Sequence, residues 1–480
     1  MPKQTPIPTT DAGPAETADV VAIQASAPEP IRRDMGARWI TVWMLLLAGL
    51  ALGGKGTAYI GYAPVFISEI ILVAGCFVLL FQRGWRELLM MPTVVLILAF
   101  IAWGLTRTLP YLGTYEFDAL RDGVIYGYSL ITLVVAGVLI SQPRLLPWVL
   151  QKYQGFARVF LLLMPIFWIA GQVLDDAVPE WPMAPGIPMI DLSTGDAPVH
   201  LGGVVALAIV GLFRADFWGL PRLFLNVLWP LMALILVAIA GAVSRGGLVS
   251  FGLACTAAFT MRPKSVWARN LLLTVVVVLP AVALIDPRIP MPGRSREFSV
   301  RQLVLNVTSI VSNDEVEGDL DETKAWRLQW WGKIIDYTFN GEYFWMGKGF
   351  GVNLADSDGF QVEFDDTPLR SPHNGHLTVL ARMGVPGFAL WIALQLSWLY
   401  TMVNAYVRAR QRGDVTWMML FVFLVAYWLA MHFNAAFDVY FEGPMGGIWL
   451  WSIIGFGLAA SWVYERRPEL LWGKPFEVQR

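Results

Sequence analysis

The sequence predicts an all-α polytopic membrane protein of about twelve transmembrane helices, with one large outer loop that contains an interfacial helix. The first observation behind this prediction is composition: 56% of the 480 residues are hydrophobic and only 15% are charged. Soluble domains carry roughly a quarter charged residues. The second is patterning, because the apolar residues gather in long runs such as 94–105, 271–285 and 448–460. About 20 apolar residues span a bilayer core of about 30 Å, and there are too many runs for a single anchor.

The runs divide the chain into five predicted parts. Residues 1–38 form a disordered cytoplasmic tail, because this stretch is rich in Pro and Ala and poor in aromatic residues. Helices 1–9 occupy residues 39–286, a large outer loop covers 287–372, helices 10–12 occupy 373–464, and a cytoplasmic tail covers 465–480. The predicted spans lie near 39–54, 63–81, 93–109, 123–140, 157–174, 199–213, 223–243, 246–261, 270–286, 376–403, 417–436 and 445–464.

Basic residues in the connections predict the orientation of these spans. With the N-terminus in the cytoplasm, every inner connection carries Arg or Lys, whereas the short outer loops keep only Lys55, Arg107, Arg121 and Arg245. Cytoplasmic loops of membrane proteins carry this excess of positive charge. The near-neutral total charge of −2 gives no reason to expect nucleic-acid binding.

The outer loop contains one segment, residues 322–340, with apolar side chains at near-helical spacing. These are Trp326, Trp330, Trp331, Ile334 and Ile335. An aromatic-rich amphipathic helix of this kind tends to lie in the headgroup layer. The spacing leaves open whether the helix only covers the bundle or forms half of a cleft that faces lipid.

A first candidate site is Ser244-Arg245-Gly246-Gly247, between two apolar runs. An arginine at this depth costs on the order of a few kcal/mol unless it has a partner or water. The two glycines leave N–H groups uncovered at a helix start, where the dipole favours anions. The motif predicts a phosphate site; the alternative is an arginine that only extends to the interface.

A second candidate is the segment from Ser371 to His376, directly before the tenth span. Ser371 followed by Pro372 is typical of a helix start, with Ser as the cap and Pro in the first position. His373 would then lie in the first turn, where the dipole disfavours the imidazolium ion and favours a neutral general base. His376 would share its face. The alternative is a pair of surface histidines without a chemical role.

Other polar residues at the predicted outer ends complete the candidates. Asp438 and Glu442 are four residues apart, Arg121 adjoins Asp122 at the start of the fourth span, and Arg327 lies in the interfacial helix. No metal site is predicted, because the short Asp-x-Asp matches at 319–321 and 356–358 arise often by chance in acidic loops. No P-loop, nucleophile elbow or zinc pattern is present, and no cofactor is predicted.

Several of these elements together resemble one known family. Pro372-His373-Asn374, followed by Gly384, is similar to the outer-loop signature of the O-antigen ligase and polymerase family, a His followed by ten residues and then Gly. Three further motifs, in the same order, resemble its Ser-Arg-Gly, Arg-x-x-x-Trp and Gly-x-Gly elements: Ser244-Arg245-Gly246, Arg327 with Trp331, and Gly347-Lys348-Gly349. The resemblance covers about residues 94–464.

The resemblance implies a membrane glycosyltransferase of the bacterial inner membrane whose active face is periplasmic. It implies metal-independent, inverting transfer of glycan from an undecaprenyl-pyrophosphate carrier to a sugar hydroxyl, in O-antigen, lipopolysaccharide or exopolysaccharide synthesis. The acceptor is a growing glycan for a polymerase and lipid A-core for a ligase, and the motifs do not separate the two. The other partner is membrane lipid.

The resemblance also implies residue roles. His373 takes the role of the base and Arg245 that of the diphosphate contact, with Arg327 as a second phosphate or loop-positioning contact. His376 and Asp438 are further substrate-binding candidates. Two departures stand out: Arg382 replaces an acidic residue of many relatives, and the 172–200 loop lacks an arginine that the polymerases use. Arg121 is the predicted substitute.

A rival function is a flippase or transporter of a lipid-linked solute. Such a protein would carry ionisable residues deep in several spans, near the midplane. Here most polar residues lie at the predicted outer ends, and no internal repeat is apparent. A membrane scaffold without chemistry would not need the His and Arg motifs at all.

Overall fold

The computed structural model describes residues 34–471, except 64, 175–176, 193–195, 218, 262–272, 275, 277–288, 291–296, 299–318 and 365–366. Eight of the described helices are long and apolar enough to cross a membrane, and three shorter apolar helices accompany them. The chain is therefore a multi-pass membrane protein, as the sequence predicts. The count of twelve spans and the periplasmic placement of the large loop stay predictions.

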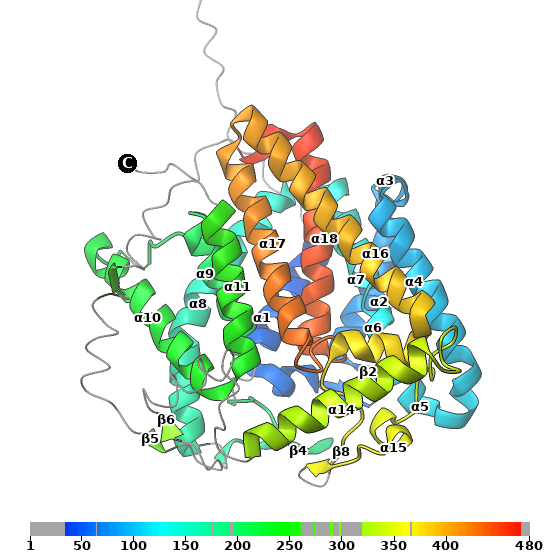
Figure 1. Cartoon of the computed structure of the whole chain (residues 1–480). Helices are drawn as coiled ribbons and strands as arrows, with labels where there is room; N and C mark the ends of the chain where they lie inside the picture. Colours follow the sequence, from blue (N-terminus) through cyan, green and yellow to red (C-terminus); the bar gives the residue numbers. More distant parts are fainter. Residues whose placement is uncertain are drawn as a thin grey trace, which may run out of the picture. The chain divides into compact units, whose positions relative to one another are not determined.

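The helices follow the predicted spans closely along the described chain (Figure 1). They are α1 Met35–Ala58, α2 Ile67–Leu80, α3 Trp85–Leu89, α4 Pro92–Thr108, α5 Leu112–Asp122, α6 Val124–Gly127, α7 Leu130–Ser141, α8 Leu145–Leu174, α9 Ala197–Ile209, α10 Arg222–Val243, α11 Arg245–Met261, α14 Asp319–Phe339, α15 Leu354–Asp358, α16 Gly375–Arg412, α17 Val415–Ala435 and α18 Pro444–Arg466, with the 3-10 turns η1 Leu109–Tyr111 and η3 Pro468–Leu471.

Several predicted spans differ from the observed helices. α8 begins at Leu145, twelve residues before the predicted start at 157, and α16 continues to Arg412, nine residues past the predicted end at 403. α1 begins at Met35 rather than at residue 39, because Asp34 caps it by accepting a hydrogen bond of 2.9 Å from the Ala37 N–H. The span predicted at 123–140 is divided between α6 and α7. The span predicted at 270–286 falls almost wholly outside the described residues.

The strands form four two-stranded antiparallel hairpins that the sequence did not predict. They are β1 Gly61–Tyr62 with β2 Val65–Phe66, β3 Glu180–Trp181 with β4 Ala184–Pro188, β5 Ile289–Pro290 with β6 Glu297–Phe298, and β7 Glu363–Phe364 with β8 Thr367–Pro368. In Figure 1, β2, β4 and β8 lie at the same lower end as α5, α14 and α15. We call this the His373 end, because α16 begins there.

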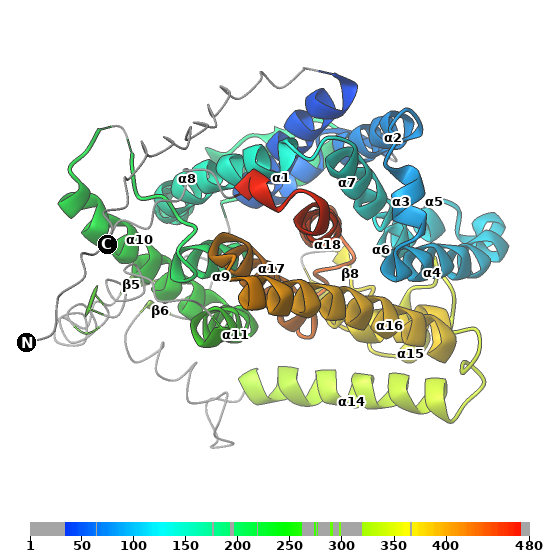
Figure 2. The ribbon, with the colours of Figure 1, turned by 90° about the horizontal axis from the view of Figure 1, so that it is seen from above.

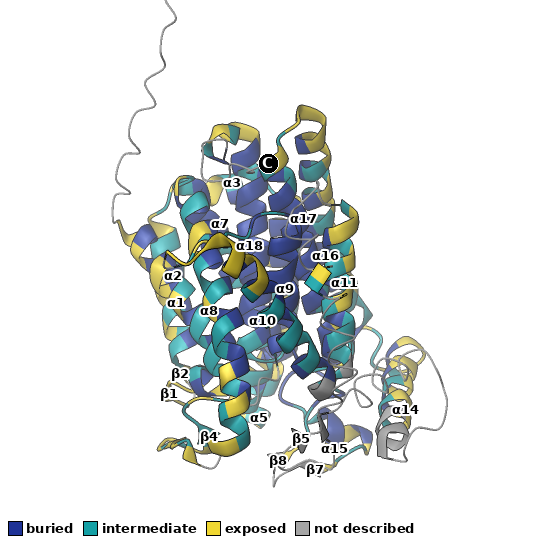
Figure 3. Ribbon diagram, turned by 90° about the vertical axis from the view of Figure 1, so that its left-hand side faces the viewer, coloured by how far each residue is buried: buried dark blue, intermediate teal, exposed yellow. Residues whose placement is uncertain are grey.

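The packing core lies around α18, which α1, α7, α16 and α17 contact. Every residue of α18 from Gly446 to Ser461 is buried, and Figure 3 shows this helix together with α17 among the most buried elements. A helix that is apolar all round belongs inside a bundle. The polar motifs of the sequence are thus restricted to the ends of the spans.

α16 is broken near its start, at Gly384, where the backbone has φ 66° and ψ −175°. Pro386 follows, and proline has no N–H to continue the helix ladder. The break leaves the carbonyls of Ala381 and Arg382 and the N–H of Val385 without partners in the helix. Unpaired backbone groups are costly away from water, so the break requires hydrogen bonds from another segment.

Segment 347–351, Gly-Lys-Gly-Phe-Gly, lies against the break and, with Phe344, supplies these hydrogen bonds. The N–H groups of Lys348 and Gly349 donate to the first two carbonyls at 2.7 and 3.0 Å, and the Phe344 carbonyl accepts from Val385 at 2.8 Å. We call this contact the α16 clasp. The Gly-x-Gly motif and Gly384 are therefore two sides of one interaction.

Glycine is required on both sides of the clasp. Gly347 has φ 58°, and a Cβ atom there would lie 2.5 Å from the carbonyl carbon of Arg382. At Gly384, with φ 66°, a Cβ atom would lie 2.6 Å from the Phe344 carbonyl oxygen. No side-chain Cβ tolerates such distances, so the two backbones meet only because both lack one.

α14 presents its tryptophan face to the protein. Trp330 and Ile334 are fully buried and pack with α15 and with Leu380 and Ala381, in the part of α16 before the break. In Figure 2 α14 lies alongside α16 on the outer side of the bundle. The segment predicted as an interfacial helix is thus a helix that is fastened to the start of α16.

The clasp predicts a selective sensitivity to added methyl groups. Gly384→Ala should lower the free energy of unfolding by about 2 kcal/mol or more, since a side chain in this backbone region costs about 1–3 kcal/mol before any clash is counted. Thermal unfolding of the purified protein in detergent measures the effect. Gly252→Ala in α11, where a Cβ atom meets nothing within 4 Å, is the matched control. Equal unfolding midpoints for the two variants would contradict the role of the clasp.

Candidate functional site

The turn that carries His373 differs from the predicted helix start. Asn374, rather than Ser371, caps α16: its Oδ1 accepts hydrogen bonds of 3.1 Å from the N–H groups of both His376 and Leu377. His373 therefore lies before the helix, not in its first turn, and the expected dipole effect on its imidazole does not apply. The prediction of a Ser cap with Pro in the first helical position is wrong.

His373 adopts an uncommon backbone conformation, with φ 50°. Residues other than glycine rarely have positive φ, and those that do cluster at functional sites. Two hydrogen bonds hold the turn in place: the Trp331 indole donates to the Pro372 carbonyl at 2.8 Å, and the Gly375 N–H donates to the Asp438 carbonyl at 3.2 Å. The turn is therefore fixed between α14 and the segment that follows α17.

That segment, residues 436–443, brings the candidate residues together. His373 Nδ1 lies 3.9 Å from Asp438 Oδ1, with side chains 26% and 46% exposed. The Arg327 guanidinium donates to the Phe437 carbonyl at 3.1 Å. Burial lowers the pKa of Arg327, and the negative charge of Asp438 opposes this shift. His373, Asp438 and Arg327 thus meet at residues 437–438, which we call the 437–438 junction.

The start of α11 also reaches the 437–438 junction. Ser244 caps the helix, accepting a hydrogen bond of 3.1 Å from the Gly247 N–H, and Arg245 is its first residue. A Cβ atom on Gly246 would lie 3.1 Å from the Cβ atom of Phe437, so the backbone passes close to this ring. The Ser-Arg-Gly motif and His373 therefore lie at the same end of the bundle.

Two carboxyl groups near the junction, those of Asp196 and Glu442, have raised pKa values that the sequence did not predict. Burial and the negative charges of Asp438 and Asp191 raise the pKa of Asp196 to about 7, while Lys55 opposes the shift. Asp196 directly precedes α9. Because Asp196 is far along the chain from the other candidate residues, nothing in the sequence indicated that it lies near them.

Glu442, the second of these carboxyls, interacts with Ser371 and Thr378, on either side of His373 in the sequence. Burial raises its pKa from an ordinary 4.5 to about 7, and the positive charge of Arg382 opposes the shift. The hydroxyl groups of Ser371 and Thr378 are its hydrogen-bond neighbours. Ser371, expected to be a helix cap, thus connects the His373 turn to residues 436–443.

Both ring nitrogens of His376 are hydrogen-bonded to groups outside the junction. Its Nδ1 accepts a hydrogen bond of 3.1 Å from the Trp391 indole, and its Nε2 lies 3.0 Å from the His432 carbonyl oxygen. An indole N–H only donates, so Nε2 carries the proton and donates to the carbonyl. His376 therefore fastens α16 to α17, which differs from the predicted face shared with His373.

Arg121 belongs to a separate ionic cluster. Its guanidinium contacts Asp118 at 3.2 Å and Asp122 at 3.4 Å. Asp122 also pairs with Arg382 at 2.9 Å and Arg370 at 3.1 Å. Arg382, the departure from the family pattern, is buried in this cluster. None of the contacts described for Arg121 involves the 437–438 junction.

In the Asp-x-Asp segment at 356–358, Asp358 is bound by other side chains of the protein. Asp358 is 1% exposed; it pairs with Lys348 and accepts a hydrogen bond of 2.7 Å from the Trp330 indole. The pair connects α15 to the α16 clasp. The side chains of residues 319 and 321 are not described, and within the described part no group of three or more His, Cys, Asp or Glu residues has the geometry of a metal site.

The environment of Glu442 predicts a pH effect. A carboxyl whose pKa is raised on folding binds more protons in the folded than in the unfolded protein, so stability falls as pH rises from about 4.5 to about 7. Glu442→Gln removes this titration. The free energy of unfolding of Glu442→Gln minus that of wild type should therefore be larger at pH 8 than at pH 5 by roughly 1–3 kcal/mol. Unfolding in detergent at the two pH values measures this difference. Glu342→Gln, at an exposed position, is the control, and parallel profiles for Glu442→Gln and wild type would refute the effect.

Comparison with known proteins agrees with the motifs. A family model described as O-antigen ligase matches residues 230–392, which include most of α10, all of α11, α14 and α15, the α16 clasp and His373. No curated protein matches the chain. Residues 230–392, about a third of the chain, are thus similar to the O-antigen ligase family, and the segment at 437–438 lies outside the matched residues.

Proposed function

We propose that the protein transfers glycan from an undecaprenyl-pyrophosphate carrier to an acceptor sugar hydroxyl at the periplasmic face of the bacterial inner membrane. The observation that carries this proposal is the 437–438 junction, where His373, Asp438, Arg327 and the start of α11 meet. A base, a carboxylate and a cationic side chain at one partly exposed point, beside a helix start, are what this transfer requires. The family match supports the substrate class.

In the proposed reaction His373 acts as the general base. The acceptor hydroxyl attacks the anomeric carbon, its proton passes to the imidazole, and the bond from the anomeric carbon to the carrier diphosphate breaks. Attack opposite the leaving diphosphate inverts the configuration. Asp438, at 3.9 Å from Nδ1, is too far for a direct hydrogen bond but stabilises the imidazolium ion electrostatically.

The departing diphosphate develops negative charge, and cationic groups stabilise it. Arg245 takes this role at the start of α11, where helix N–H groups also favour anions. Arg327 is the second cation, because the hydrogen bond that its guanidinium donates to the Phe437 carbonyl keeps it beside the junction. A guanidinium suits phosphate geometry, so the proposed transfer needs no metal ion. Arg121 is kept as a candidate for substrate contact away from the junction, and His376 as a residue that positions α16.

The acceptor is either a growing lipid-linked glycan, for a polymerase, or lipid A-core, for a ligase. The described contacts at the junction do not select one of them. The two cases differ in product, and this difference makes them separable by experiment.

Substitutions at His373 test the catalytic proposal. His373→Ala should reduce transfer about 100-fold or more, the usual contribution of a general base. His373→Asn is the sharper variant, because asparagine tolerates positive φ and so keeps the turn while it removes the base. Arg410→Ala, exposed at the opposite end of α16, is the control. Surface glycan is sized on gels from cells that express each variant.

The glycan pattern distinguishes the outcomes. Shortened chains indicate a polymerase, and full-length glycan that stays on its carrier indicates a ligase. Glycan retained on the cytoplasmic face would favour the flippase instead. Wild-type glycan from His373→Asn and from Arg245→Ala would refute the catalytic roles.

Asp438 provides a second test. Asp438→Asn removes the negative charge beside His373 with little change in shape, so transfer by purified protein should fall about tenfold. Transfer by Asp438→Asn at the wild-type rate would contradict the electrostatic role of Asp438 beside His373.

A further inference from the structure

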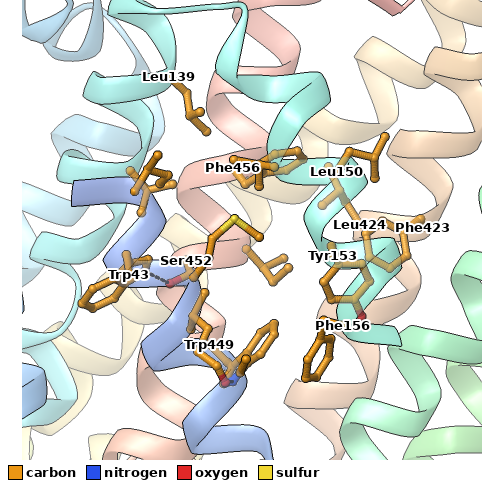
Figure 4. A pocket seen from close by; sticks show the side chains of 17 residues that line it. Trp43, Leu139, Leu150, Tyr153, Phe156, Phe423, Leu424, Trp449, Ser452 and Phe456 are labelled. Atoms are coloured by element: carbon orange, nitrogen blue, oxygen red, sulfur yellow. Dashed lines mark hydrogen bonds between the residues drawn. The ribbon is translucent and has the colours of Figure 1, made fainter. Parts of the chain in front are cut away.

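The bundle contains an apolar cavity that the proposed chemistry does not use. It lies among α1, α7, α8, α17 and α18, has a volume of about 70 Å³ and is open at its mouth (Figure 4). Its wall consists of Leu, Ile, Val, Met and aromatic side chains, with Trp43, Tyr153 and Trp449 as the largest. All five helices belong to the described spans that are long and apolar enough to cross a membrane.

The wall offers a polar ligand at most one side-chain hydrogen-bond donor. The Trp43 indole donates to Ser452 Oγ at 2.9 Å, and the Ser452 hydroxyl donates within α18 at 2.7 Å. The Trp449 indole donates to a backbone carbonyl of α1 at 3.1 Å. The Tyr153 phenol is then the only polar side-chain group of the wall whose hydrogen is not already donated in these bonds. Apolar cavities of this kind hold hydrocarbon rather than water or sugar.

The mouth of the cavity lies between α1 and α8. Among the lining residues, Met44, Ala48, Val149 and Phe156 are partly exposed and belong to these two helices, whereas the contributions of α7, α17 and α18 are buried. Leu45 beside the mouth is 68% exposed. In a membrane-crossing bundle such a surface faces lipid, so the mouth opens toward the hydrocarbon core.

A basic side chain lies next to this mouth. Lys152 is one turn from Val149 and Phe156 on α8, and its Nζ lies 5.6 Å from the ring centroid of Trp148, toward the start of the helix. A lysine near a helix end extends its amine to the interface while its stem lies against lipid. Anionic headgroups are attracted to such positions.

We infer that the cavity takes up part of one acyl chain of an anionic phospholipid, that the rest of the chain lies along the open mouth, and that the headgroup lies beside Lys152. The start of α8 lies at the end of the bundle opposite His373, because residue Gln142, just before it, bonds to Asp34 at the start of α1, while α1 ends at the His373 end. The lipid therefore comes from the leaflet remote from the 437–438 junction. The α1 and α8 side also lies across the bundle from α14 and α16 (Figure 2), so the occupant is not the chain of the glycan carrier.

Native mass spectrometry of the full-length protein tests the acyl-chain site. Wild type should retain a phospholipid on release from detergent micelles. Ala48→Trp places an indole in the mouth and should weaken retention about tenfold or more, since each buried methylene contributes a factor of about four in binding. Leu45→Trp, one turn away on the lipid-facing surface, is the matched control and should retain the lipid. Equal retention by Ala48→Trp and Leu45→Trp would overturn the site.

The headgroup is tested on a variant that leaves the cavity intact. Nanodiscs that contain phosphatidylglycerol or phosphatidylcholine are compared for Lys152→Gln and wild type. Wild type should retain phosphatidylglycerol in preference to phosphatidylcholine, and Lys152→Gln should lose this preference while it keeps total lipid. A retained lipid that proves to be a polyprenyl diphosphate, or a preference unaffected by Lys152→Gln, would refute the proposal without affecting the catalytic one.

Discussion

The structure at the His373 end depends on hydrogen bonds that replace those lost where α16 breaks. A helix inside a membrane protein cannot leave backbone groups unpaired, because no water is at hand to satisfy them. Gly384 and Pro386 create the deficit, and residues 344–349 fill it. Because the same segment carries Lys348, which pairs with buried Asp358, the clasp also fixes α15, and α14 packs on both. The large loop is thereby attached to the start of α16, where His373 lies.

The net charge near the junction depends on the burial of its acidic groups as well as on their ion pairs. Asp196 and Glu442 have raised pKa values because burial disfavours their charged forms, so near neutral pH both carry less than a full negative charge. Asp438 is nearly half exposed and provides the carboxylate beside His373. The negative charge near the junction is therefore smaller than the number of acidic residues suggests, which favours an anionic substrate next to Arg327.

Much of the fold was predictable because hydrophobic runs report membrane spans directly. The helical class, the multi-pass character and most helix positions follow from runs such as 417–436, seen as α17. The motifs at residues 244–246, 327 and 373 were recognisable from spacing, and they lie at one end of the bundle. The cap of α16 was not predictable: Ser371 and Asn374 are both good caps, and contacts from Trp331 and Asp438 decide between them.

Other features arise only from tertiary contacts. Nothing in the local sequence of His376 shows that Trp391 and His432 occupy both of its ring nitrogens. Likewise Asp196 and Glu442 are ordinary carboxyls in the sequence, and only burial changes them. The partner of Arg382 is Asp122, far away along the chain, so its departure from the family pattern could be noticed but not interpreted.

The backbone of His373 has a consequence for how this protein can change. A β-carbon at φ 50° costs the folded state free energy that a glycine would not cost. Selection for thermal endurance alone would therefore tend to replace this histidine, and its proposed role as the general base would account for its place at a position that lowers stability.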